Sequence, residues 1–160
     1  MSSTAAHHVV EKLLQNSLDP AIVREIVAPD ATYMSLTYEN PELKKILPYC
    51  GVQPEGGPDA VLGVFGFVNK IWAIEDFDIK KSFSSGENAA VFGSMRYRSK
   101  TLGKVFTSPF SIWATVIGGK ITYMQFLEDT LLSTSSFKEG GEGPLNTYIV
   151  DPETNERVTA

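Results

Sequence analysis

Residues 89–127 read AAVFGSMRYRSKTLGKVFTSPFSIWATVIGGKITYMQFL, and this stretch decides the fold. It contains three runs rich in β-branched and aromatic residues, at Ala89–Arg98, Lys104–Ile117 and Lys120–Leu127. Only short glycine-containing turns separate these runs. Three long strands joined by tight turns predict an antiparallel meander.

The first part of the chain has the pattern of amphipathic helices. One helix is expected to end near Leu18, and Asp19 followed by Pro20 is a typical start for a second. A third helix, from about Pro58 to Trp72, is apolar on almost every face, which indicates burial on most sides. Helices followed by a long sheet predict an α+β fold. We expect a cone-shaped α+β barrel, with the N-terminal helices packed in a strongly curved mixed or antiparallel sheet, a short C-terminal helix and a polar tail.

Two further runs alternate between apolar and polar residues and are expected to be strands, at Ala31–Tyr38 and Asp76–Phe83. Side chains two positions apart on a strand point to the same side of the sheet. In the second run, Phe77, Ile79 and Phe83 are therefore expected to share one face.

Length and charge restrict the class of protein. The 160 residues provide one domain with a substantial core, which we place at residues 1–138, followed by a tail at residues 139–160. The net charge of −5 argues against nucleic acid and anionic membrane surfaces as partners. No apolar run is long enough to span a membrane, and the first residues lack the features of a secretory signal. Together with a single cysteine, Cys50, these features predict a cytoplasmic location.

Four short runs carry a resemblance to a known family: Ile26–Tyr33, Gly57–Val61, Ile112–Ile121 and Glu128–Thr130. With the order of the elements, they resemble the nuclear-transport-factor-2-like superfamily, also called ketosteroid-isomerase-like, and its SnoaL-like (polyketide-cyclase-like) branch. The resemblance implies a curved sheet around helices, a deep apolar pocket for a hydrophobic small molecule, no cofactor and a homodimer. Members include isomerases, aldol-type cyclases, dehydratases, epoxide hydrolases and non-catalytic binding or scaffolding proteins, so the fold leaves the function open.

The resemblance directs the search for an acid/base group to the last strand. Polyketide cyclases of the family carry an aspartate within that strand, but Tyr123–Phe126 contains no acid. The nearest carboxylates, Glu128 and Asp129, are therefore the candidate general bases. An apolar pocket raises the pKa of a carboxyl group toward neutrality, which suits it to proton transfer. Asp129 has a second interpretation, as the N-cap of the last helix.

Tyrosine and arginine side chains are candidates for holding a substrate oxygen. Steroid isomerases of the family use a tyrosine on the first helix, where this chain has none. Tyr33 is our catalytic candidate for that role, and Tyr38 and Tyr123 are candidate ligand-binding residues. Arg96 and Arg98 share one face of a strand. They either bind an acidic substrate or form ion pairs on an outer face.

Aromatic residues complete the set of candidate ligand-binding residues: Phe65, Trp72, Trp113 and Phe126. Residues of this kind either line a pocket or fill a core, and the pattern does not separate these two uses. The only histidines, the His7–His8 pair, lie next to each other near the start of the chain. We therefore predict no metal site.

Two functions from different classes follow. The first is a cofactor-independent isomerase, cyclase or lyase that acts on a hydrophobic carbonyl compound by acid/base catalysis. The second is a non-catalytic module that binds a hydrophobic ligand or assembles as a dimer.

Overall fold

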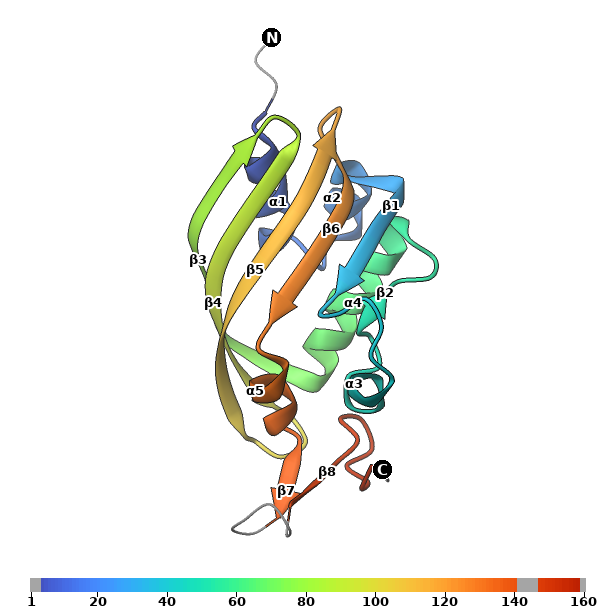
Figure 1. The fold of residues 1–160 in the computed structure, drawn as a ribbon, viewed down its shortest axis with the longest axis vertical. Helices are drawn as coiled ribbons and strands as arrows, with labels where there is room; N and C mark the ends of the chain where they lie inside the picture. The colour runs from blue at the N-terminus through green and yellow to red at the C-terminus, as the bar shows by residue number, and fades with distance from the viewer. Residues whose placement is uncertain (1–3, 141–146, 159–160) are drawn as a thin grey trace.

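The computed structural model describes residues 4–140 and 147–158, and its centre is a six-stranded curved sheet (Figure 1). The strand order is β2-β1-β6-β5-β4-β3, so β2 and β3 are the open edges. Neighbouring strands are antiparallel except β1 and β6, which are parallel. The strands are β1 (Val27–Ser35), β2 (Gly51–Val52), β3 (Trp72–Ser85), β4 (Asn88–Ser99), β5 (Val105–Ile117) and β6 (Lys120–Glu128). The predicted α+β cone is confirmed as a mixed, strongly curved sheet that remains open.

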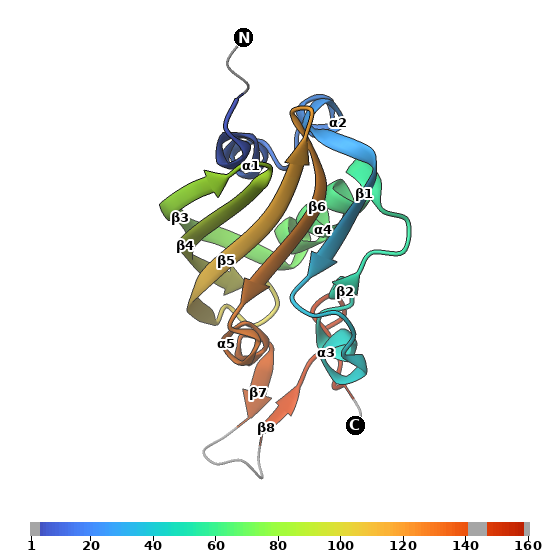
Figure 2. The ribbon, with the colours of Figure 1, turned by 45° about the horizontal axis from the view of Figure 1, so that its top comes forward.

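The main helices cover one face of this sheet (Figures 1 and 2). The helices are α1 (Ala6–Gln15), α2 (Pro20–Ile26), α3 (Pro41–Ile46), α4 (Gly57–Ile71) and α5 (Thr130–Ser135). Helices α1, α2 and α4 contact the strands, and α5 continues directly from β6 at the lower end of the sheet. No helix in the described ranges has the length and apolar character needed to cross a membrane.

Strand β1 begins earlier than the alternation predicts. The carboxylate of Asp19 accepts hydrogen bonds from the amides of Ala21 (3.0 Å) and Ile22 (3.3 Å), so helix α2 begins as expected. The strand starts immediately after α2 and runs through Pro29. Its register against β6 shifts between the pairs formed by Val27 and Thr32. The position that lacks an amide hydrogen therefore falls where the ladder is already irregular.

The face assignment in β3 is wrong beyond its midpoint. The register against β4 shifts between Ile79 and Lys81, which reverses the alternation of the side chains that follow. Phe83 is 59% exposed, and its ring lies 6.0 Å from that of Phe92. Ser84 instead turns toward α1, where its hydroxyl lies 2.8 Å from Nδ1 of His7.

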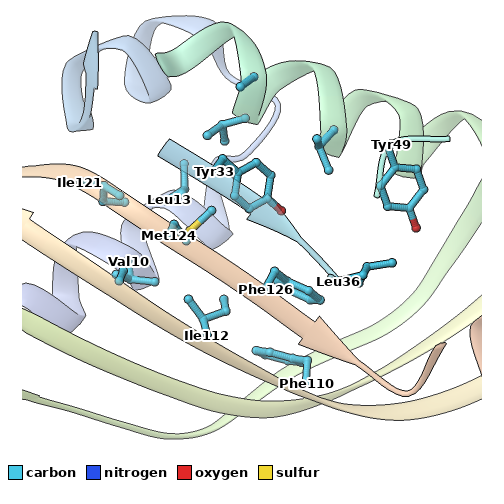
Figure 3. Packing of buried hydrophobic residues seen from close by; sticks show 14 of the residues in the cluster. Val10, Leu13, Tyr33, Leu36, Tyr49, Phe110, Ile112, Ile121, Met124 and Phe126 are labelled. Atoms are coloured by element: carbon cyan, nitrogen blue, oxygen red, sulfur yellow. The ribbon is translucent and has the colours of Figure 1, made fainter. Parts of the chain in front are cut away.

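The core lies between helix α4, helix α1 and the concave face of the sheet (Figure 3). Strands β1, β5 and β6 and helix α1 contribute its central side chains: Val10, Leu13, Tyr33, Phe110, Ile112, Ile121, Met124 and Phe126. Gly63 and Gly66 of α4 have nothing within 4 Å of the point where a Cβ would stand. These glycines therefore leave open space beside the helix instead of permitting close contact of two backbones.

The last described segment packs against the end of the sheet. Strands β7 (Lys138–Gly140) and β8 (Thr147–Ile149) form a separate antiparallel pair. Phe137 and Val150 are fully buried and belong to the main core cluster. Lys70 of α4 forms an ion pair with Glu153 beyond β8.

Candidate active site

Glu128 lies at the end of β6, where its carboxyl group points into the protein. The residue as a whole is half-buried, but its Oε2 is shielded from solvent and has no hydrogen-bond partner among the described residues. Burial raises the pKa of Glu128 to about 8, and the charge of Asp129 adds to this rise against a lowering by the Ser133 hydroxyl. Such a carboxyl group is largely protonated at neutral pH and still able to lose its proton.

The carboxyl group of Glu128 borders a small inner cavity beneath α4. The cavity leaves about 20 Å³ for the centre of a water molecule, which is room for roughly one water. Its walls come from β1, the segment after α3, α4, β4 and β6. The lining residues are Tyr33, Ser35, Tyr49, Val64, Phe65, Val68, Met95, Tyr97, Phe126 and Glu128.

Three tyrosines line this cavity and contribute most of its polar groups. Tyr33, Tyr49 and Tyr97 are each at most 7% exposed. Burial raises the pKa of each hydroxyl far above its ordinary value, and a charge on Glu128 would raise it further. The hydroxyls therefore stay protonated as hydrogen-bond donors. The Tyr49 hydroxyl is buried without a partner in the described part of the chain, and its ring lies between α4 and the sheet (Figure 3).

A larger outer groove adjoins the inner cavity on the side of α1 and β3. It has a volume of about 440 Å³. Its walls are mainly apolar, with two amides, two hydroxyls and a carboxylate among them: Leu14, Gln15, Ser17, Phe65, Val68, Asn69, Ile74, Phe77, Asp78, Ile79 and Tyr97. Phe65, Val68 and Tyr97 also line the inner cavity, so they separate the two spaces.

The structure brings four of the sequence candidates together at the inner cavity: Glu128, Tyr33, Phe65 and Phe126. Trp72 lies one layer behind them. It is 1% exposed, and its Nε1 donates to the Ser136 hydroxyl at 3.0 Å. Its ring contacts the rings of Tyr49 and Tyr97, so it supports cavity residues without lining the cavity.

Asp129 lies at the start of α5, outside the cavity lining. Its Oδ1 accepts a hydrogen bond from the Leu132 amide at 3.2 Å, which is the geometry of an N-cap. Its own amide donates to the Ser108 hydroxyl at 2.9 Å. The side chain is exposed.

The two arginines lie on the outer face of the sheet, away from the cavity. The Nε atoms of Arg96 and Arg98 lie 3.0 and 2.6 Å from the two carboxylate oxygens of Glu75. Hydrogen bonding from Arg98 and Arg96 lowers the pKa of Glu75. The arginines are thus engaged in an exposed ion-pair network.

The remaining aromatic candidates are also directed outward. Trp113 is 46% exposed, and its ring lies 5.0 Å from that of Tyr123. The Tyr123 hydroxyl donates to the Gln125 side chain at 3.0 Å. Tyr38, after the end of β1, is 68% exposed. None of these three residues lines the inner cavity.

Sequence reasoning missed two tyrosines of the cavity. Tyr97 lies between Arg96 and Arg98, and strand alternation alone places it on the face opposite to theirs. That signal was available, because an exposed arginine pair implies a buried tyrosine between them. Tyr49 follows Pro48 in a loop, where no periodicity indicates which way a side chain points.

Comparison with known proteins places this chain in a family. No family model matches the chain. Patulin synthesis protein F from Aspergillus clavatus is 37% identical over 150 residues, which cover 92% of this chain and 75% of that protein. Patulin biosynthesis cluster protein F from Penicillium expansum is 35% identical over 148 residues, covering 91% of this chain and 73% of that protein.

Solved structures agree on the fold. An NTF2-like protein from Burkholderia thailandensis has a TM-score of 0.71 at 19% identity, over 86% of this chain and all of that one. IdmH from Streptomyces antibioticus, a candidate polyketide cyclase, has a TM-score of 0.59 at 16% identity, over 81% and 95% of the two chains. The resemblance drawn from the sequence is therefore confirmed. The chain has the nuclear-transport-factor-2-like fold and belongs to the family of patulin synthesis protein F.

Proposed function

We propose that the protein is a cofactor-independent isomerase, cyclase or lyase acting on a small hydrophobic carbonyl compound. The observation that carries this proposal is the unpartnered carboxyl oxygen of Glu128 at a cavity ringed by buried tyrosine hydroxyls. Buried polar groups without partners are costly, and catalytic sites are one of the places where proteins keep them. The relatives are named for the synthesis of patulin, which supports a role in small-molecule biosynthesis for this chain as well.

The chemistry follows from the two kinds of group at the cavity. Ionised Glu128 would take a proton from a carbon next to the substrate carbonyl. The electron pair of the broken C–H bond would move onto the carbonyl oxygen and form an enolate. Tyr33 or Tyr49 would donate a hydrogen bond to that oxygen. Return of the proton from Glu128 to another carbon of a conjugated enolate gives isomerisation. Attack of the enolate carbon on a second carbonyl carbon of the substrate, whose oxygen then takes the proton from Glu128, gives cyclisation. Departure of a β substituent, which takes the proton from Glu128, gives elimination.

A panel of small ketones, enones and cyclic polyketide-like compounds tests this proposal. We expect Glu128→Gln to lower kcat by roughly 10²- to 10⁴-fold, the usual contribution of a general acid/base group. Asp129→Asn is the matched control, because it removes a neighbouring charge and keeps the cap oxygen. Full turnover by the Glu128→Gln protein would overturn the assignment.

A non-catalytic binding module is the second candidate. The observation that favours it is the small volume of the inner cavity, about 20 Å³. In that case the outer groove alone would hold an apolar ligand. Calorimetry would then show a hydrophobic compound binding equally well to the wild type and to Glu128→Gln, with no compound of the panel converted.

We also propose that the protein is a cytoplasmic homodimer joined through the outer face of the sheet. Trp113, Phe83 and Phe92 are 42–59% exposed on its strands, and aromatic residues are enriched at interfaces between subunits. The single cysteine is free and buried, which fits a reducing compartment. Sedimentation would show a dimer that Trp113→Glu dissociates. Leu18→Glu, at a position 51% exposed between α1 and α2, would leave it intact. A monomeric wild type would contradict the interface.

A further inference from the structure

Phe65 lies in the wall between the inner cavity and the outer groove. Among the described residues, Phe65, Val68 and Tyr97 line both spaces. Tyr97 is 6% exposed, and its ring packs against the rings of Trp72 (5.9 Å) and Phe106 (5.7 Å). Phe65 is half-buried, and its ring lies parallel to that of Tyr33 at a longer centroid distance of 6.2 Å. Tyr97 is thus packed against two other rings on the strand side, whereas Phe65 is more exposed on the α4 side.

There is room beside Phe65 for its ring to move. The outer groove adjoins it with about 440 Å³ of space. An aromatic side chain changes rotamer readily when no neighbour occupies its new position. An outward rotation of the Phe65 ring would join the two spaces.

The size of the inner cavity means that a side chain in its wall must move before an organic substrate can reach Glu128. About 20 Å³ accepts a water molecule and excludes any organic carbonyl compound. A substrate can lie in the outer groove with the ring of Phe65 in place. An outward rotation of Phe65 would let it reach the carboxyl group from the groove.

We propose that Phe65 is a movable partition and that the opening it leaves determines which substrates reach Glu128. This inference rests on the proposed function. The groove fits a compound with an apolar body, which would pack against Ile74 and Phe77, and a carbonyl end that passes the partition. Phe65 is a specificity-determining residue in this scheme and takes no part in proton transfer.

The titration of Glu128 tests the partition without any substrate. Carbon NMR of glutamate-labelled protein follows the side-chain carboxyl, and the signal missing from Glu128→Gln identifies it. We expect a midpoint of about 8 in the wild type. Phe65→Ala admits water to the cavity and lowers the midpoint by about one pH unit or more. The other groups that face the carboxyl, Tyr33, Tyr49, Tyr97, Asp129 and Ser133, are unchanged in this variant.

Phe77→Ala is the matched control. Phe77 lines the outer groove and not the inner cavity, and its ring stacks on Phe110 at 4.5 Å. Its removal widens the groove by the same number of atoms and leaves the wall intact. The midpoint of Glu128 should stay at the wild-type value. If Phe65→Ala fails to fold, Phe65→Leu makes the same test with a smaller opening.

Two outcomes would overturn the partition. One is a Glu128 midpoint in the Phe65 variants that equals that of the wild type. The other is a wild-type Glu128 midpoint already near 4.5, which means that the wall does not keep water from the carboxyl group. Neither outcome depends on turnover, so the effect of Glu128→Gln on kcat still tests the proposed function by itself. With a converted substrate, Phe65→Ala should raise the kcat/KM ratio of a bulkier over a smaller analogue by roughly tenfold or more.

Discussion

The buried carboxyl group of Glu128 should make stability depend on pH. Its pKa is about 8 in the folded protein and near the ordinary 4.5 in the unfolded chain. Between these values the folded state holds a proton that the unfolded state has lost, so stability falls as pH rises, by about 1.4 kcal/mol per pH unit. Below pH 4.5 and above pH 8 both states carry the same number of protons on this group, and its contribution is flat.

Glu128→Gln removes this dependence. Near pH 4.5 the variant should unfold at about the same temperature as the wild type, and toward pH 8 it should become the more stable protein. A stability difference of 1 kcal/mol corresponds to roughly 2–4 °C in Tm for a chain of this size. Thermal unfolding at half-unit steps of pH checks this. Parallel curves for the two proteins across the whole range would contradict a raised pKa.

At the level of single residues, sequence reasoning located the candidates that follow from strand ends and missed those that depend on contacts. The family resemblance directs attention to the last strand, where Glu128 is the nearest carboxylate, and to Tyr33 on the first strand as a substitute for a tyrosine that the first helix lacks. The parallel pairing of β1 with β6 joins them in space. Tyr49 comes from a loop, and its position depends on packing against Phe67 and Trp72. Such contacts leave no local pattern.

At the level of elements, substitutions of Asp129 test how much its N-cap hydrogen bond stabilises helix α5. Asp129→Ala removes the oxygen that accepts from the Leu132 amide, and the free energy of unfolding should fall by about 1 kcal/mol. Asp129→Asn keeps an accepting oxygen and should retain most of the stability. Urea unfolding of both variants gives the difference. Equal losses in the two would mean that the charge of Asp129, and not the cap, matters.

Replacement by alanine should have opposite effects on stability at two glycines, one on α4 and one on β4. Gly63 has open space around its missing side chain on α4, so Gly63→Ala should stabilise the helix by up to about 1 kcal/mol. On β4, a Cβ at Gly93 would collide with the Asp78 carbonyl and the Phe110 ring. Gly93→Ala should therefore cost several times that amount. Chemical unfolding measures both changes, and a stabilised Gly93→Ala protein would contradict the packing of β3 on β4.

Helices and strand faces can be predicted where the periodicity of the sequence is uninterrupted. The prediction is wrong where a β-bulge shifts the register of a strand. Helix α4 lies within one residue of its expected start and end, because its apolar residues and flanking signals agree. The faces of β3 were assigned correctly up to Ile79 and wrongly after it. An extra residue in one strand depends on its partner strand, and no single run of sequence specifies it.

For the whole molecule, the order of helices and strands was sufficient to identify the fold, because few architectures bury such a pattern. The volume of the space between the helices and the sheet could not be predicted from the sequence. The same aromatic residues line a cavity or fill it, and the difference of a few ångströms in how Phe65, Tyr97 and Phe126 pack is a property of the assembled core. The sequence therefore predicts one deep apolar pocket, whereas the structure has a small inner cavity and a separate outer groove.

A substitution at Val150 tests whether the C-terminal segment belongs to the cooperatively folded domain. This residue lies beyond the expected end of the domain at residue 138, yet its side chain is fully buried in the main core cluster. Val150→Ala removes two methyl groups from this site and should cost about 2 kcal/mol of unfolding free energy. Glu153→Ala is the matched control in the same segment, because it breaks only a partly exposed ion pair with Lys70 and should cost less than about 1 kcal/mol. If urea unfolding shows no loss for Val150→Ala, residues 139–160 behave as a tail; a loss makes the segment part of the cooperative fold.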